Sequence, residues 1–263
     1  MIIEIDELAE NIRNNILAKT KINKYKLVSV ALDPDKSTIA YLNSQKNLSK
    51  KLNVEYDLIL TKNKHDLIEI IKKLNNDETV NGIFLAQPLP FDPYEVIPYI
   101  DPKKDIEGIT PYNLGNLIYG KSYFLPCTAD STIRILNSFT NPDGKNATVI
   151  GRSVIVGIPV SVLLSNKENN ATVTICHSHT KNLKNITLNA DIIIVAAGTP
   201  DLIKKDMVKK ESIVIDVGIN VQNGHIVGDV AKDVKEIAYV TEVPGGVGEI
   251  TSLILFENLT KTI

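Results

Sequence analysis

Apolar and polar positions follow two different periodicities along the first half of the chain. Short apolar runs, typical of buried strands, occur at 26–32 (KLVSVAL), 55–60 (EYDLIL) and 80–90 (VNGIFLAQPLP). Between them, residues 38–52 and 64–77 place apolar side chains three or four positions apart, which predicts amphipathic helices. Strands that alternate with helices in this way are typical of a parallel sheet with helices on its faces.

The middle and the end of the chain carry two further helical patterns. No helix or strand is assigned to residues 100–117, and an irregular region follows them. The segment CTADSTIRILNSF (127–139) then predicts a helix that Thr128 or Asp130 could cap, because both side chains can accept backbone N–H groups. The final residues, 248–263, also predict a helix, which could pack back on the first half of the chain.

Runs of Val and Ile dominate the second half of the chain. Continuous runs of this kind, without polar alternation, are typical of central parallel strands that are buried on both faces. They occur at 146–151, 170–178, 190–200, 211–220 and 237–246, with a short helix predicted at 159–166. A second α/β unit is therefore expected.

The expected fold is α/β, with two domains and a cleft between them. The first domain, built on a parallel sheet, is predicted over residues 1–118 and is completed by the C-terminal helix at 248–263. The second, of Rossmann type, is predicted over residues 119–247. A chain of 263 residues is long enough for two such domains.

Composition narrows the class of protein without identifying it. With 43% hydrophobic residues, 23% charged residues and a formal net charge of -2, the chain is an ordinary globular protein, so neither a nucleic-acid partner nor a membrane partner is expected. Cys127 and Cys176 form no paired motif, which predicts neither a disulfide framework nor a zinc site. Since no signal peptide and no bilayer-length apolar run is visible, a soluble, cytoplasmic protein is expected.

A glycine-containing turn after the strand at 146–151 is the first candidate for chemistry. Gly151, Ser153 and Gly157 stand in a variant of the dinucleotide fingerprint, with Ser153 at the place of the second glycine. Gly151 would permit the tight turn, and the N-terminal amides and dipole of the next helix would hold a pyrophosphate. Such a loop alone could equally be a structural turn, but its place between a strand and a helix favours a cofactor.

The end of the next strand indicates which dinucleotide binds. NAD sites usually carry a carboxylate there for the ribose 2′-hydroxyl, whereas this chain has Cys176, His177, Ser178 and His179. Arg152 lies in the glycine-containing turn, where it could be either a solvated charge or a phosphate ligand. A cation and a hydroxyl in place of an acid favour a 2′-phosphate, and therefore NADP. Two histidines without a further ligand do not indicate a metal site.

The string VPGGVGEIT (243–251) is the least ordinary in the chain. Pro244, Gly245 and Gly246 interrupt a strand with a turn whose backbone can approach a flat ligand closely. A lone PGG would indicate no more than a tight turn before a helix. The PGG of this chain occurs together with other unusual strings.

The unusual residues are Tyr41 and the strings PLP (88–90), KDIEG (104–108), PCT (126–128), GRSVIVGIP (151–159), IDVGIN (215–220), VGDV (227–230) and PGGVG (244–248). Taken together and in this order, they resemble the methylenetetrahydrofolate dehydrogenase/cyclohydrolase family over nearly the whole chain. The family implies a homodimer of two-domain subunits. It implies that a tetrahydrofolate one-carbon derivative lies in the interdomain cleft against NADP, with residues 1–118 as the folate-binding catalytic domain and 119–247 as the NADP-binding domain.

The resemblance also implies the residues of each site. Tyr41, Gln45 and Glu107 stand at catalytic positions. The substrate positions are Tyr41, Gln87, Pro88, Leu89, Glu107, Pro244, Gly245 and Gly246. The cofactor positions are Thr128, Gly151, Arg152, Ser153, Val156, Gly157, His177, Ser178, Ala197, Gly198, Val217, Gly218, Ile219 and Thr251. No metal is implied.

Two departures from the family pattern bear on the chemistry. The family usually has a lysine where this chain has Gln45, and a glutamine where this chain has Ala86, with Gln87 one place later. Since residues four apart share a helix face, Gln45 lies beside Tyr41, whereas Lys46 points about 140° away and is not expected to replace the lysine. Gln87 would replace the glutamine only through a strand bulge.

The two reactions of the family need different groups. Hydride transfer from the bridging carbon of 5,10-methylenetetrahydrofolate to nicotinamide needs the two carbons held together in a dry site, which Tyr41, Glu107 (an aspartate in the family) and the turn at 244–246 can provide. Hydrolysis of the methenyl product to 10-formyltetrahydrofolate moves protons, and Gln45 cannot titrate. We therefore predict an NADP-dependent dehydrogenase with weak or absent cyclohydrolase activity.

Three other interpretations stay open. The chain could be a fully bifunctional dehydrogenase/cyclohydrolase. It could be a nucleotide-binding regulatory protein that has lost catalysis, as the changes at Gln45 and Ala86 would allow. A shikimate- or amino-acid-type dehydrogenase would share the cofactor domain, but it would not need Tyr41, KDIEG and PGGVG together.

Overall fold

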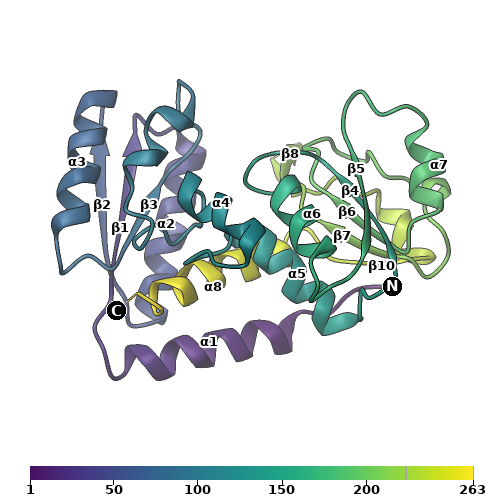
Figure 1. Cartoon of the computed structure of the whole chain (residues 1–263), viewed down its shortest axis with the longest axis horizontal. Coiled ribbons are helices and arrows are strands. Elements are labelled where there is room, and N and C mark those ends of the chain that lie inside the picture. The colour runs from purple at the N-terminus through teal and green to yellow at the C-terminus, as the bar shows by residue number, and fades with distance from the viewer. Residues whose placement is uncertain (223, 263) are drawn as a thin grey trace. The chain divides into compact units, whose positions relative to one another are not determined.

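The computed structural model describes residues 1–222 and 224–262, which form two compact units (Figure 1). The three-stranded unit consists of Glu10–Cys127 and Ser252–Ile263. The five-stranded unit consists of Met1–Ala9 and Thr128–Thr251. Each unit is built on a parallel sheet, as the alternation of strand and helix patterns predicts.

Strands and helices alternate in the three-stranded unit. Its elements are α1 (Asp6–Thr20), β1 (Lys26–Leu32), α2 (Lys36–Lys51), β2 (Glu55–Thr61), α3 (Lys64–Asn76), β3 (Gly82–Leu85), the 3-10 turns η1 (Pro93–Glu95) and η2 (Ile97–Tyr99), α4 (Pro111–Tyr119) and the end of α8 (Val247–Leu259). The strand order is β2-β1-β3, with all pairs parallel.

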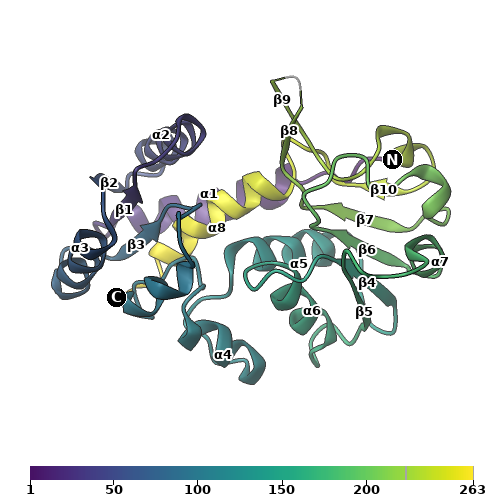
Figure 2. The ribbon, with the colours of Figure 1, turned by 90° about the horizontal axis from the view of Figure 1, so that it is seen from above.

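The two faces of this sheet differ because neighbours along a strand point to opposite sides. Val28, Val30 and Ile83 pack on the α3 side, in an apolar core. The alternate positions, which include Ser29 on β1 and Phe84 opposite it on β3, face α2. Figure 2 shows α2 and α3 on opposite sides of the strands. A buried serine on the α2 side is therefore placed directly beneath the helix that carries Tyr41.

The C-terminal helix completes the three-stranded unit. Phe256 and Leu259 are fully buried, and Asn258 Nδ2 donates to the Ile106 carbonyl at 3.0 Å. A Cβ atom at Gly82 would lie 2.6 Å from Leu259 Cδ1, so β3 can lie this close to α8 only with a glycine.

The five-stranded unit has the order β10-β7-β6-β4-β5, and all of these strands are parallel. Its elements are α5 (Cys127–Phe139), β4 (Asn146–Ile150), α6 (Gly157–Ser165), β5 (Thr172–Cys176), α7 (Leu183–Leu188), β6 (Ile192–Val195), η3 (Lys205–Met207), β7 (Ile213–Asp216), β8 (Asn220–Gln222), β9 (His225–Val227), η4 (Lys232–Glu236) and β10 (Tyr239–Val240). Strands β8 and β9 form a separate antiparallel pair. Because β5 and β6 lie on opposite sides of β4, the strand order reverses there, and ligands bind at the carboxyl ends of such strands in open α/β sheets.

The first residues of the chain extend the five-stranded sheet. The Ile3 N–H donates to the Val240 carbonyl at 2.9 Å, the Val240 N–H donates to the Met1 carbonyl at 3.0 Å, and Ile2 pairs in parallel with Val240. The division of the chain therefore differs from the predicted limits of 1–118 and 119–247. Residues 1–9 join the second half through this pairing, and residues 119–127 stay with the first.

The periodicities predict most elements and miss some. Strand β1 spans the predicted residues 26–32, but β3 ends at Leu85, before the prolines that follow, because proline cannot donate a ladder hydrogen bond. The cap prediction for α5 is wrong, since the helix begins at Cys127 and contains Thr128 and Asp130. The periodicities do not predict helix α4.

The signals for α4 are nevertheless present in the sequence. Thr110 Oγ1 accepts the Asn113 N–H at 3.4 Å, Pro111 fills the first helical position, and Gly120 ends the helix with φ +64°. Among the described residues, no helix combines the length and the apolar character that a bilayer span would need.

Candidate active site

Tyr41 and Gln45 lie one turn apart on α2. The helix begins where the Asp35 carboxylate accepts the Thr38 N–H at 2.7 Å. Tyr41 is 43% exposed, and its ring centroid lies 5.8 Å from that of Phe84 on β3. Gln45 is only 3% exposed, so the helix face that carries both residues holds a polar amide in the protein interior.

Only one of the two polar atoms of the Gln45 amide forms a hydrogen bond with the described residues. Its Oε1 accepts the hydroxyl of Ser29 at 3.1 Å. Its Nε2 has no hydrogen-bond partner among the residues that the structure describes. Lys46 is exposed, as helix geometry predicts, so its amine does not take the place of the missing lysine.

Ala86 and Gln87 follow β3 at the carboxyl end of the three-stranded sheet. Ala86 is 4% exposed, and its N–H donates to the Val30 carbonyl at 2.9 Å. Gln87 is half-buried and joined to Pro88 by a cis peptide bond, and Leu89 packs against the apolar core. The position of the family glutamine thus holds a methyl group without hydrogen-bonding capacity.

The KDIEG segment holds two carboxyl groups two residues apart. Asp105, 1% exposed, accepts the N–H groups of Ile109 at 3.2 Å and Thr110 at 2.7 Å, and Nδ2 of Asn113 at 2.8 Å. These bonds fix the turn that leads into α4. Desolvation, reinforced by the nearby Asp105 charge, raises the pKa of Glu107 to about 8. The free protein therefore holds Glu107 mainly protonated at neutral pH.

Glu107 and Gln45 both act on the Tyr41 hydroxyl. Desolvation raises the pKa of Tyr41, and the charge of Glu107 raises it further. The neighbouring Gln45 amide opposes the shift, although it forms no hydrogen bond with the hydroxyl. The hydroxyl therefore stays neutral and can both donate and accept hydrogen bonds. The three predicted catalytic residues are brought together in the three-stranded unit.

The turn after β4 has the local structure that the fingerprint predicts. Gly151 has φ +127°, and a Cβ atom there would clash with the Ala196 carbonyl oxygen. A Cβ atom at Gly157 would clash with the Gly151 carbonyl. The Ser153 hydroxyl accepts the N–H groups of Val156 at 3.2 Å and Gly157 at 3.4 Å, at the start of α6.

An anion would be favoured at this turn. The N-terminus of α6 directs backbone amides and the positive end of the helix dipole toward it. Arg152 is exposed there, and its side chain has no hydrogen bond or ion pair within the described part of the chain. It is therefore available to a phosphate group.

The end of β5 holds the two predicted adenosine-side residues. The His177 N–H donates to Thr180 Oγ1 at 2.8 Å, and His177 Nδ1 accepts the His179 N–H at 3.2 Å. Ser178, between them, is exposed. Over residues 1–222 and 224–262, no group of three or more His, Cys, Asp or Glu side chains is placed to hold a metal ion.

Two aspartates outside the predicted site residues organise the loops after β6 and β7. Asp229 is fully buried and receives the N–H groups of Ala197 and Gly198. Asp216 is 3% exposed and receives the Gly218 N–H, and desolvation raises its pKa to about 6. The amides of these predicted cofactor residues are thus already occupied. The strings IDVGIN and VGDV each contain one of the aspartates, which is the signal that could have identified them.

The predicted residues at the end of the second half also lie in the five-stranded unit. The turn after β10 has a cis Val243–Pro244 bond and φ +99° at Gly245, and a Cβ atom at Gly246 would clash with the Glu242 carbonyl. Thr251 Oγ1 and Ser131 Oγ share a hydrogen bond of 2.8 Å. Ser131 also donates to the Thr128 carbonyl at 2.9 Å, which places Thr128 and Thr251 close together.

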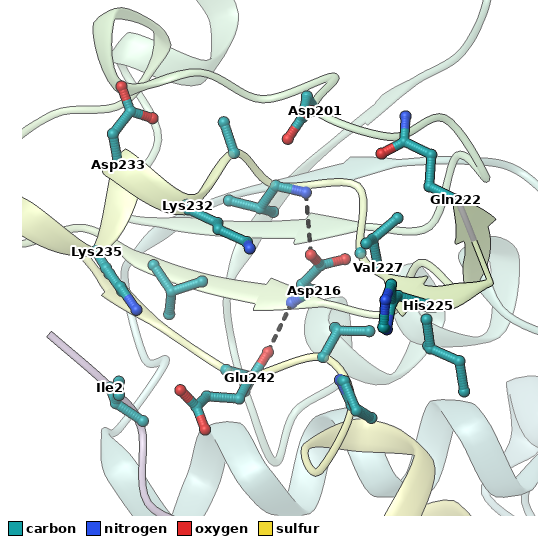
Figure 3. Close-up of a pocket in the computed structure, with 18 of the residues that line it drawn as sticks. Ile2, Asp201, Asp216, Gln222, His225, Val227, Lys232, Asp233, Lys235 and Glu242 are labelled. Carbon is teal, nitrogen blue, oxygen red and sulfur yellow. Dashed lines mark hydrogen bonds between the residues drawn. The ribbon is translucent and has the colours of Figure 1, made fainter.

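A hollow of about 1140 Å³ opens beside β7 and β10 (Figure 3). It is lined by the ends of both strands, by β9 and by η4, and Asp216, His225, Lys232 and Glu242 are among its residues. Of the predicted site residues only Pro244 lines it, so this hollow is distinct from the turn after β4.

Comparison with known proteins covers nearly the whole chain. The family model described as tetrahydrofolate dehydrogenase/cyclohydrolase, catalytic domain, matches residues 3–107, and that of the NAD(P)-binding domain matches residues 126–263. The bifunctional protein FolD of Thermosipho africanus is 49% identical over 265 residues, covering 100% of this chain and 98% of the relative.

Two solved structures show the same similarity. The bifunctional enzyme FolD, methylenetetrahydrofolate dehydrogenase/cyclohydrolase, from Campylobacter jejuni is 34% identical with a TM-score of 0.95, covering 100% of this chain and 98% of that one. The methylenetetrahydrofolate dehydrogenase-cyclohydrolase of Trypanosoma brucei, solved with NADP and an inhibitor, is 28% identical with a TM-score of 0.92, covering 100% and 96%.

Proposed function

Because the chain belongs to the tetrahydrofolate dehydrogenase/cyclohydrolase family, we propose that it oxidises 5,10-methylenetetrahydrofolate to 5,10-methenyltetrahydrofolate with NADP in one-carbon metabolism. It hydrolyses the methenyl product to 10-formyltetrahydrofolate weakly or not at all. The observation that carries this second part is Gln45, a buried amide that cannot titrate at the place of the family lysine. The family assignment sets aside a shikimate-type dehydrogenase.

On the folate side, the three-stranded unit would hold the substrate through Tyr41 and Glu107. The ionised Glu107 carboxylate would accept the amino and ring N–H groups of the pteridine, and the neutral Tyr41 hydroxyl would contact the one-carbon edge. Neither residue exchanges a proton in the oxidation, since the hydride leaves the bridging carbon with its electron pair and the folate nitrogens stabilise the resulting cation. The resemblance to the family also assigns the turn at 244–246 to the folate substrate.

On the cofactor side, bound NADP would supply the hydride acceptor. The turn at 151–157 would hold the pyrophosphate at the start of α6, with Ser153 keeping that turn in shape. Arg152 and Ser178 would bind the 2′-phosphate, because both are exposed and no carboxylate follows β5. This arrangement supports NADP over NAD.

The hydrolytic step is where this chain would fail. Adding water to the methenyl bridge and opening the ring needs a group that can take up and release a proton. Gln45 can only donate or accept hydrogen bonds, and Ala86 offers no polar atom. Lys46 is exposed on another side of α2. Neither Gln45 nor Ala86 therefore supplies the amine, and Lys46 points away from Tyr41 on the helix.

Full bifunctionality is the second candidate, because the similar FolD proteins of Thermosipho africanus and Campylobacter jejuni are both named as bifunctional. A catalytically inactive nucleotide-binding protein is the third. Paired rates separate all three: reduction of NADP by methylenetetrahydrofolate, and disappearance of methenyltetrahydrofolate above the buffer rate. Oxidation without hydrolysis supports the proposal, and equal rates contradict its second part. No reduction of NADP or NAD contradicts its first part and, if hydrolysis is also absent, supports the inactive nucleotide-binding protein.

We also propose a homodimer, as the family implies. Light scattering coupled to size-exclusion chromatography tests it directly. A mass near 29.0 kDa across the concentration range would contradict the proposal, because that is the mass of a single chain.

A further inference from the structure

A fully buried carboxylate lies behind the loops that follow β6 and β7. Asp229 Oδ2 accepts the N–H groups of Ala197 at 2.7 Å and Gly198 at 2.8 Å. Its Oδ1 accepts the Thr199 N–H at 2.8 Å and Asn220 Nδ2 at 2.8 Å. One side chain therefore joins the loop after β6 to the beginning of β8.

These four donors use the whole capacity of the carboxylate. An ionised carboxyl group offers about four lone-pair positions, so Asp229 has none left for a ligand. Its exposed fraction is 0%, so it does not touch one. Any effect of Asp229 on binding must pass through the loops that it holds.

The orientation of the peptide groups shows what those loops present. In a trans peptide unit the N–H and the preceding C=O point in opposite directions. Since the N–H groups of Gly198 and Thr199 point at Asp229, the carbonyl groups of Ala197 and Gly198 point away from it. Residues 197–199 are exposed, so these two acceptors lie at the open carboxyl end of β6, where ligands bind in such sheets.

A second aspartate keeps the first in place. Asp216, the last residue of β7, accepts the N–H groups of Gly218, Asp229 and Val230, each at 3.0 Å. A Cβ atom at Gly218 would clash with the Asp229 carboxyl group, and one at Gly228 would clash with that of Asp216. The two carboxylates and two glycines therefore leave Asp229 no room to shift, and Figure 3 shows Asp216 with its hydrogen bonds to two neighbouring segments.

We propose that Asp229 is a positioning residue for the nicotinamide half of the cofactor. It turns the peptide groups at 197–199 so that their carbonyl oxygens accept the ribose hydroxyl and carboxamide N–H groups of the nicotinamide riboside. The inference rests on the proposed NADP site. The pyrophosphate is assigned to the turn at 151–157 and the 2′-phosphate to Arg152 and Ser178. Asp229 makes no hydrogen bond to any of these residues within the described chain.

The test compares the whole cofactor with its adenosine half. Asp229→Asn removes the charge and places an N–H donor against backbone N–H groups. We expect the Kd of NADP to rise about tenfold or more and that of 2′,5′-ADP to change by less than about twofold, since only NADP reaches the loops that lose a charged hydrogen-bond acceptor. Calorimetry at a pH well above the Asp216 pKa of about 6 keeps that second carboxylate ionised.

Two further variants accompany this measurement, one as a control and one as a milder test. Asp191→Asn makes the same chemical change just before β6, where Asp191 accepts the Asn146 N–H at 2.8 Å and pairs with Lys209. It should leave both Kd values unchanged. Asn220→Ala removes one of the four donors without burying a new polar group, so it should raise the NADP Kd by less than Asp229→Asn does. If Asp229→Asn fails to fold, Asn220→Ala alone tests the proposal.

The possible outcomes are distinct. Selective weakening of NADP in Asp229→Asn or Asn220→Ala supports the positioning role. Equal weakening of both ligands would show general loosening of the unit and would overturn it, as would an unchanged NADP Kd. If the unaltered protein binds neither ligand, the proposed function fails first and this inference fails with it.

Discussion

Buried polar groups near the two predicted sites differ in how fully they are paired. In the five-stranded unit, Asp229 receives four hydrogen bonds and Asp216 receives three from backbone N–H groups. In the three-stranded unit, Gln45 keeps a buried Nε2 without a partner among the described residues, and Glu107 lies where desolvation raises its pKa to about 8.

The difference separates groups that hold the protein together from groups that wait for a ligand. Saturated carboxylates fix loops and have nothing left to bind, whereas a buried unpaired donor costs about 1–3 kcal/mol and therefore needs an explanation. A substrate acceptor or a bound water would supply one for Gln45. On this argument, the folate side of the molecule gives up stability that the cofactor side retains.

The largest expected effect comes from restoring the amine. Gln45→Lys should raise methenyltetrahydrofolate hydrolysis by about 10²–10⁴-fold, the usual contribution of a general acid or base, while NADP reduction changes far less. Loss of the methenyl absorbance measures it. Lys46→Gln, at the exposed neighbouring position, is the matched control and should change neither rate.

Gln45→Lys can also contradict the assignment of weak hydrolysis to Gln45 alone. No gain with Gln45→Lys, followed by a gain with Gln45→Lys and Ala86→Gln together, would show that the amide at 86 is also required. Hydrolysis in the unaltered protein at the dehydrogenase rate would show that Gln45 supports the reaction as well as the lysine does, and the unpaired Gln45 amide would then mark no lost activity.

Glu107 gives the next effect, as a dependence of folate binding on pH. The pKa of Glu107 is about 8 in the folded protein, above its ordinary value of 4.5. Protonation of Glu107 therefore stabilises the folded state fully below pH 4.5, and this stabilisation is lost as the pH rises through 8. If the substrate binds the carboxylate, its Kd should fall about tenfold for each pH unit up to the folded pKa. Fluorescence titration across that range measures it.

Glu107→Gln tests the cause of that dependence. The amide keeps the size of the side chain and cannot ionise, so the slope of log Kd against pH should disappear and binding should be weaker at high pH. A slope that survives the substitution would assign the titration to another group and would remove Glu107 from the folate side.

Periodicity predicts the scaffold of both sites but not the partners within them. Helix geometry places Gln45 beside Tyr41 and Lys46 away from it, and the structure confirms the exposure of Lys46. That Ser29 holds the Gln45 amide, 16 residues away in sequence, depends on which strand lies beneath the helix. No local pattern contains that information.

The aspartate pair shows the same limit on the cofactor side. Fingerprint spacing predicts the turn at 151–157, because one short segment contains the entire motif. Asp216 and Asp229 meet only after β7, β8 and β9 are arranged, and the pKa of Asp216 is raised because elements remote in sequence bury it. The missed helix α4 differs, since Thr110, Pro111 and Gly120 signal it locally.

Removing the Arg152 cation should produce a moderate and selective effect on the cofactor side. Arg152→Ala should raise the KM of NADP about tenfold, as expected for a lost charged hydrogen bond, and should leave the KM of NAD nearly unchanged because NAD lacks the 2′-phosphate. Initial rates with both cofactors measure this. Equal losses would mean that Arg152 binds the pyrophosphate shared by both cofactors.

The smallest expected effect comes from the Ser29 hydroxyl beneath α2. It tests whether the Gln45 amide stabilises the fold or binds a ligand. Ser29→Ala leaves Gln45 Oε1 as unpaired as its Nε2 already is, so the free energy of unfolding should fall by about 1 kcal/mol. Urea unfolding measures it, with Ser138→Ala as a matched control that removes an ordinary helix hydroxyl bonded to the Ile135 carbonyl. With its acceptor end released, the amide can turn, and the KM for methylenetetrahydrofolate should rise while the KM for NADP stays constant. A loss of stability with both KM values unchanged would mean that the Gln45 amide serves the protein interior and not the substrate.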